Sequence, residues 1–224
     1  VSRHERVALV VIDGLSLGLW RFMLPMIRQS SWHVTEAASF AWIPTHNANH
    51  HKYVNGPGDA TITWRYTKKD NFFVASTFFF VSSYWQGPLI KAYIKQAREN
   101  HPKIFRQIVV QYAAVVLGQL GFLAIAIALH GAKTGILVYM CSFGATAAMG
   151  MWGMMFINYI QHVHCDPTSK YDHSRNFVSR WMNFFVFDNG YHTVHHARAG
   201  LHWSHARAEH EKVAHLIDPR LQLR

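Results

Sequence analysis

Two long apolar runs without any charged residue lie in the middle of the chain. Residues 108–129 read IVVQYAAVVLGQLGFLAIAIAL, and residues 135–160 read GILVYMCSFGATAAMGMWGMMFINYI. A helix rises about 1.5 Å per residue, so each run is long enough to cross a hydrocarbon core about 30 Å thick. Small residues scattered through both runs favour close packing between membrane helices. We therefore predict a membrane-spanning helical hairpin, with the buried hairpin of a soluble protein as the alternative.

Two further apolar stretches are interrupted by polar residues. Residues 7–27 contain Asp13, Arg21 and Pro25, and the aromatic residues 71–90 contain Gln-Gly-Pro near their end. Each pattern fits a span, an interfacial helix or a re-entrant segment. For residues 71–90 we favour an interfacial or partly inserted helix, because a full crossing would put the histidine groups described below on opposite faces of the membrane.

The charged residues lie on both sides of the predicted hairpin. Lys91, Lys95 and Arg98 precede it, Arg175 and Arg180 follow it, and the connecting loop carries one lysine. By the positive-inside rule, both flanks are cytoplasmic. This topology accounts for the net charge of +10 without a nucleic-acid partner, and the sequence contains no recognised nucleic-acid motif.

Composition supports this reading and adds a second feature. Only 15% of the residues are charged, against about 25% in ordinary soluble domains. The two cysteines, Cys141 and Cys165, cannot form a disulfide framework. Histidine is the unusual residue, because its 17 copies exceed the 12 acidic residues.

The histidines gather in three groups at residues 46–51, 162–164 and 192–196. Residues four apart share one face of a helix, so His46 lies with His50 and His192 lies with His196. The first group precedes the hairpin and the other two follow it. All three groups therefore fall on one side of the membrane, where we expect the imidazoles to meet and bind metal: His46, His50, His51, His162, His164, His192, His195 and His196.

The number and type of ligands restrict the metal. Imidazole suits zinc, copper, iron and nickel. A structural zinc ion needs only four ligands and usually takes cysteine, and bis-histidine haem fits adjacent histidine pairs poorly. A soluble di-iron bundle uses Glu-x-x-His ligands, which this sequence does not contain. Two iron ions with positions left open for oxygen fit the pattern better.

These boxes resemble those of the membrane-bound fatty acid desaturase and alkane hydroxylase superfamily of histidine-box di-iron enzymes. The H-x-x-x-H-H and H-x-x-H-H boxes flank a membrane hairpin, and the resemblance runs from about residue 44 to residue 203. The segment FDNGYHTVHH at 187–196, followed by GLHW at 200–203, is similar to bacterial members.

The resemblance implies a di-iron centre, molecular oxygen as co-substrate and attack on an unactivated C–H bond of a lipid. It implies that His162 fills the additional ligand position between the last span and the final box, with Asn158 and His164 as further candidates. No catalytic residue beyond the metal centre is expected. Outer-shell partners should orient the imidazoles, and the aspartates near the boxes are candidates for this role: Asp59, Asp166, Asp172 and Asp188.

One feature departs from the family pattern. Members have an earlier H-x-x-x-H box after an initial pair of spans, and here only His4 stands before His46. His4 is a candidate remnant of that box or a surface histidine. We therefore hypothesise that the chain is the C-terminal part of a longer enzyme, with a truncated non-catalytic membrane subunit, assembled with other subunits, as the competing reading.

The resulting expectation is an all-α, multi-pass integral membrane protein with a cytoplasmic histidine-rich helical cap, in a bacterial inner membrane. Residues 1–107 would hold the membrane or interfacial helices and the first box, 108–160 the hairpin and 161–224 the cap, as one functional domain. The expected function is a fatty acyl desaturase, with a hydroxylase or decarboxylase of a fatty acid, alkane or carotenoid as the alternative. A ferredoxin, rubredoxin or cytochrome would supply the electrons.

Overall fold

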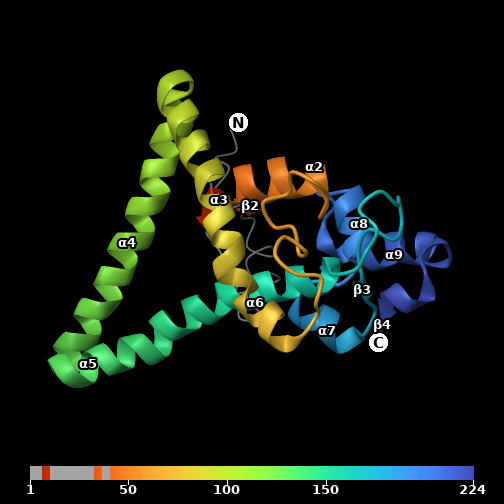
Figure 1. Ribbon diagram of the computed structural model, residues 1–224. Helices are drawn as coiled ribbons and strands as arrows, with labels where there is room; N and C mark the ends of the chain where they lie inside the picture. Colours follow the sequence, from red (N-terminus) through yellow and green to blue (C-terminus); the bar gives the residue numbers. More distant parts are fainter. Residues whose placement is uncertain (1–6, 11–32, 37–40) are drawn as a thin grey trace, which may run out of the picture. The chain divides into compact units, whose positions relative to one another are not determined.

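The computed structural model describes residues 7–10, 33–36 and 41–224 (Figure 1). His4 and most of the interrupted stretch at 7–27 lie outside these residues. The described chain is mostly helical, as predicted, with two small parallel sheets. Strand β1 (Val7–Val10) pairs with β2 (His33–Glu36), and β3 (Asn176–Phe177) pairs with β4 (Gln222–Leu223).

The chain divides into two compact units. The first consists of Val1–Ile43 and Leu89–Gly153, and the second of Pro44–Pro88 and Met154–Arg224. One boundary falls at Pro88 inside α3 (Phe72–Asn100). Proline lacks a backbone N–H and removes one helical hydrogen bond, so the helix is weakest where the division occurs.

The first unit contains most of the predicted membrane hairpin. Helix α4 (Pro102–His130) is followed by α5 (Ala132–Tyr139), a π-helical stretch η2 (Met140–Gly144) and the start of α6 (Ala145–His162). The two continuous helical segments, Pro102–His130 and Ala132–His162, are long and apolar enough to cross a membrane. Helix α3, which covers the aromatic stretch at 71–90, does not meet the same criterion of length and hydropathy.

Close packing holds the hairpin together at its turn. Gly131 makes the turn with a φ of 75°, which favours glycine. A Cβ atom on Gly135 would lie 2.5 Å from the backbone of Ala126 and Ile127, so only glycine allows α5 to approach α4 this closely. Further along, the Phe122 and Phe143 rings stack with their centroids 4.3 Å apart. The small and aromatic residues of the two runs thus have defined packing roles.

Replacement of Gly135 by alanine should destabilise the hairpin. The added methyl group meets backbone atoms that cannot move aside, and such overpacking costs about 1–3 kcal/mol. Thermal unfolding of the purified protein in detergent should therefore show a lower midpoint. Gly118→Ala in α4 is the control, because a Cβ atom there meets nothing within 4 Å. Equal midpoints for the two variants would contradict this account.

The second unit contains the histidine-rich segments. It begins within the π-helical segment η1 (Ile43–His50), continues into α2 (His51–Tyr53) and includes the first turns of α3 and the last turns of α6. Its remaining helices are, in chain order, α7 (Arg180–Phe185), α8 (His192–Ala197), α9 (Trp203–Val213), η3 (Ala214–Leu216) and η4 (Pro219–Leu221).

An apolar core in the second unit fixes the start of α3 against the end of α6. Ala75 and Phe78 of α3 pack against Met155, Tyr159 and Val163 of the α6 segment. The Phe78 and Tyr159 rings lie 5.2 Å apart. This core packs the C-terminal end of α6, which carries His162, against the start of α3.

Candidate metal centre

Four histidines from three elements point their Nε2 atoms at one another. His162 Nε2, at the end of α6, lies 3.1 Å from His50 Nε2, 3.0 Å from His192 Nε2 and 3.2 Å from His196 Nε2. The last two nitrogens, both on α8, lie 3.2 Å apart. His50, His162 and His192 are almost fully buried. These four side chains, His50, His162, His192 and His196, form the first histidine group, which could hold a metal ion.

Three more histidines form a second group beside the first. His51 Nε2 lies 3.2 Å from His46 Nε2 and 3.1 Å from His195 Nε2, and the last two atoms lie 3.3 Å apart. These side chains are only half buried. The rings of His51 and His196 lie 4.6 Å apart, so the two groups are neighbours.

Local helix geometry divides the histidines between the groups. On α8, His192 and His196 are four residues apart and share a face, while His195 points into the second group. On η1 the structure differs from the expectation that His46 and His50, four residues apart, lie together on one helix face. Their rings do stack 5.2 Å apart, but the Nε2 atom of His46 joins His51. A π-helical turn closes at i+5 rather than i+4, which places His46 beside His51.

Asp59 fixes the orientation of His50. Its Oδ2 lies 2.8 Å from His50 Nδ1, and the carboxylate also accepts hydrogen bonds from the Asn55 backbone and from the Thr61 backbone and hydroxyl. Burial alone would raise the pKa of Asp59, but the hydrogen bonds from His50 and Thr61 lower it to about 2. The carboxylate is therefore ionised and only accepts, so Nδ1 of His50 carries the proton and Nε2 offers a lone pair.

His162 has the same arrangement with a backbone partner. Its Nδ1 lies 3.1 Å from the carbonyl oxygen of His173, which can only accept. The Asn55 side chain donates to the carbonyl of His162 at 3.0 Å and accepts from the Thr63 N–H at 2.7 Å. The loop that carries Asp59 is thus tied directly to the end of α6.

The geometry of the first histidine group fits a bound metal ion. The Nε2 lone pairs of His50 and His162 face each other at 3.1 Å, which is repulsive unless a cation lies between them. An ion with metal–nitrogen bonds of about 2.0–2.1 Å separates two ligands at right angles by about 2.9 Å. The nitrogen–nitrogen distances of 3.0–3.3 Å in both groups are close to that value. Seven converging imidazoles therefore fit two metal ions.

Burial lowers the pKa of five histidines of the two groups and so favours the neutral form that metal binding requires. Burial and, secondarily, the neighbouring imidazoles lower the pKa of His195 to about 3 and that of His51 to about 4. The same causes hold the pKa values of His46, His192 and His196 well below their ordinary value. A neutral shell of this kind binds divalent ions without burying additional negative charge.

The metal-free protein should lose stability as the pH falls below about 6.5. The folded-state pKa values of His51 and His195, about 4 and about 3, lie below the unfolded value of 6.5. Between these limits the unfolded chain binds more protons, so the free energy of unfolding decreases as the pH decreases. Urea unfolding of chelator-treated protein between pH 8 and pH 5 measures this effect. A urea midpoint that stays constant between pH 8 and pH 5 would contradict the conclusion that these histidines are neutral in the folded protein.

The remaining candidate ligands differ in position. Asn158 Nδ2 lies 3.4 Å from His50 Nε2, and its Oδ1 is buried without a partner among the described residues. His164 lies outside both groups, because its φ of 58° turns the chain away and its Nε2 lies 3.3 Å from Asp70. Nothing in the described part of the chain bears on His4.

Of the four candidate aspartates, Asp59 contacts a histidine of the two groups, His50. Asp166 accepts hydrogen bonds from Thr168 in an exposed turn, and Asp172 accepts from the backbone of Asp218. His173 was not expected near the centre; its carbonyl positions His162, and its ring lies 5.3 Å from that of His196. No local pattern in the sequence marks such a backbone role.

Comparison with known proteins supports a family assignment. The family described as Fatty acid desaturase matches residues 16–223, almost the whole chain. No match was found among curated proteins or solved structures. The match spans both candidate membrane helices and all seven histidines of the two groups. The chain therefore belongs to the fatty acid desaturase family of membrane enzymes.

Proposed function

We propose that this protein is an oxygen-dependent di-iron oxidoreductase that removes one hydrogen atom from each of two adjacent carbons of a fatty acyl chain, at unactivated C–H bonds, and leaves a double bond, while oxygen is reduced to water. The observation that carries the proposal is the convergence of seven imidazoles into two adjacent groups within a chain of the desaturase family. Bound iron would supply the activation of molecular oxygen, with two electrons from a donor protein.

In this proposal each histidine group holds one iron ion. His50, His162, His192 and His196 would bind the first ion, and His46, His51 and His195 the second. The Oδ1 of Asn158, which is buried and unpartnered, is a further candidate beside the first ion. His4 stays a prediction from the sequence, and the position of His164 argues against a ligand role.

The protein's own residues would orient and protect the centre. Asp59 holds the proton on Nδ1 of His50, and the His173 carbonyl does the same for His162. Burial of the first group excludes water from its nitrogens. The second group is half buried, so oxygen and substrate would approach the centre from its side.

The proposal also includes an electron-donor protein and a location in the membrane. A ferredoxin, rubredoxin or cytochrome would deliver electrons at the cytoplasmic face of a bacterial inner membrane. The basic residues that flank the hairpin support this orientation by the positive-inside rule. Acidic donors would also be steered towards a basic face.

Metal and product analysis of the detergent-purified protein tests the proposal. We expect about two iron ions per chain, from one per histidine group, and an unsaturated acyl product when oxygen and a reduced ferredoxin are supplied. An alcohol or a shortened hydrocarbon as the product would assign the hydroxylase or decarboxylase alternative instead. Iron-loaded protein that consumes no oxygen with any lipid would support the non-catalytic membrane subunit.

A further inference from the structure

A cavity of about 360 Å³ lies beside the C-terminal end of α6, within the second unit. The lining of the cavity combines apolar and aromatic side chains with two lysines. The apolar and aromatic residues are Trp64, Tyr159, Val163 and Pro167, and the lysines are Lys68 and Lys69. The cavity is separate from the histidine groups, none of whose members line it.

The position of the cavity along the chain relates it to the membrane. Tyr159 lies in the last turn of a helix that is long and apolar enough to span a bilayer, and Val163 follows the end of that helix. The hydroxyl of Tyr159 donates to the carbonyl of Lys69 at 3.4 Å, which ties the lysine segment to the helix end. Aromatic residues and lysines at a helix end are typical of the membrane–water interface.

The two lysines in the cavity lining bring positive charge to it. Lys68 and Lys69 are exposed, and neither forms an ion pair within the described part of the chain. Asp70, the acid next to Lys69 in the sequence, lies 3.3 Å from His164 Nε2. Thr63 also lines the cavity, and its buried hydroxyl has no hydrogen-bond partner among the described residues. Two ammonium groups and an unused hydroxyl are therefore available to an anion.

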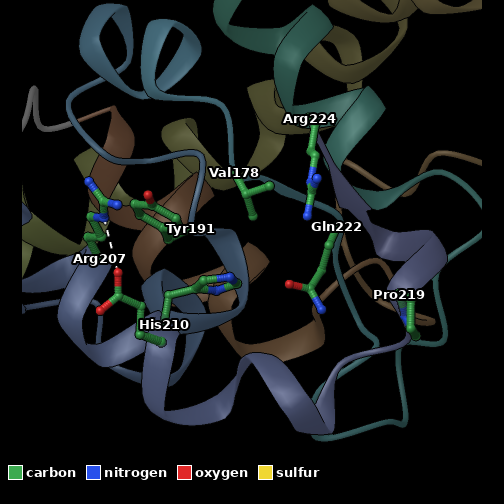
Figure 2. Close-up of a pocket in the computed structure, with 8 residues that line it drawn as sticks. Val178, Tyr191, Arg207, His210, Pro219, Gln222 and Arg224 are labelled. Carbon is green, nitrogen blue, oxygen red and sulfur yellow. Dashed lines mark hydrogen bonds and ion pairs between the residues drawn. The ribbon is translucent and has the colours of Figure 1, made fainter.

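A second cavity of about 360 Å³ in the same unit lacks this combination (Figure 2). Arg207, His210 and Arg224 line it together with Glu211, and the Arg207 Nε atom lies 3.1 Å from the Glu211 carboxylate. The charge of Arg207 is thus already matched inside that cavity. Its walls are also more polar, so it is a poorer site for an amphiphile.

We propose that the cavity beside α6 binds a lipid with an anionic headgroup. The phosphate or carboxylate would lie between Lys68 and Lys69, and the first carbons of the acyl chain would lie against Tyr159 and Val163. This site does not depend on the metal centre or on the proposed reaction.

Binding of single-chain lipids to the purified protein tests the site. The probes are lysophosphatidylglycerol, palmitate, zwitterionic lysophosphatidylcholine and inorganic phosphate, each measured by native mass spectrometry in a neutral detergent. At least one of the two anionic lipids should bind about ten-fold more tightly than lysophosphatidylcholine. Selective binding of lysophosphatidylglycerol would identify the headgroup as a phosphate, and selective binding of palmitate would identify it as a carboxylate. Either result supports the site.

Substitution of the two lysines provides the decisive comparison. Lys68→Gln with Lys69→Gln should weaken binding of the anionic lipid about 25-fold, from about five-fold for each lysine. Lys170→Gln is the control, because Lys170 is an exposed lysine of the same unit outside the cavity. Unchanged binding in the double variant, or equal binding of all lipids, would overturn the proposal. Inorganic phosphate that binds as tightly as the lipid would also overturn it, because the apolar wall would then contribute nothing.

Discussion

His162→Ala is expected to lose iron from the first histidine group together with all measurable activity, whereas His164→Ala keeps both. His162 Nε2 lies within 3.2 Å of the Nε2 atoms of His50, His192 and His196, so its removal leaves a gap at the centre of that group. Loss of an outer-shell partner typically costs 10–100-fold in metal affinity or activity, and loss of a direct ligand should exceed about 100-fold. Iron content per chain and oxygen consumption with a lipid substrate measure the effect.

The two variants form a matched pair because the residues are close in sequence but differ in environment. His164 is exposed and lies beside Asp70, outside both groups. His195→Ala completes the set, since it should empty only the second group and leave about one iron ion per chain. Size-exclusion chromatography in detergent establishes that each variant is folded. Equal iron content in the His162 and His164 variants would show that the histidine groups are not the metal site.

The two candidate membrane helices could be predicted from the sequence because an uncharged apolar run of this length has few stable solutions. Residues 108–129 and 135–160 lie within the two helical segments Pro102–His130 and Ala132–His162. The spacing of His192, His195 and His196 also predicts their arrangement. In an ordinary α-helix, His192 and His196 lie on one face, and they belong to the same histidine group.

The arrangement of the first histidine box, residues 46–51, could not be predicted from its spacing. Its segment is π-helical, so His46 pairs with His51, whereas α-helical spacing places it with His50. Whether a turn closes at i+4 or at i+5 depends on the packing around it, and the local sequence carries no signal for it. The ring of His46 is consequently close to His50 while its metal-facing nitrogen belongs to the other group.

Backbone conformation also decided which polar neighbours reach the centre. Val54 and Asn55 have positive φ values, and this sharp turn brings Asp59 back beneath His50. His164 also has a positive φ, and there the effect is to turn the side chain away from the histidine groups. Such left-handed positions are rare for residues other than glycine, so sequence proximity to a box does not predict them.

Asp59→Asn should weaken metal binding at the first histidine group while the protein stays folded. Asparagine is nearly isosteric with aspartate and can still accept the Nδ1–H of His50, but it loses the negative charge. Its amide group would also face the backbone N–H and hydroxyl of Thr61, both of which now donate to the carboxylate at 2.7 Å. His50 would then be held less firmly and its Nε2 would become a weaker donor. We expect a 10–100-fold loss of iron affinity or activity, roughly the usual range for such partners.

A competition assay with a chelator, at fixed pH and iron concentration, measures this affinity directly. Asp166→Asn is the matched control, because Asp166 lies near the second box but its carboxylate accepts from Thr168 of its own exposed turn. The control should bind iron as the wild type does. If Asp59→Asn also binds iron normally but has lost activity, Asp59 would act on the reaction rather than on the metal. Because the pKa of Asp59 is about 2, its carboxylate stays ionised throughout the range in which the assay is possible, so the defect should not depend on pH between 6 and 8.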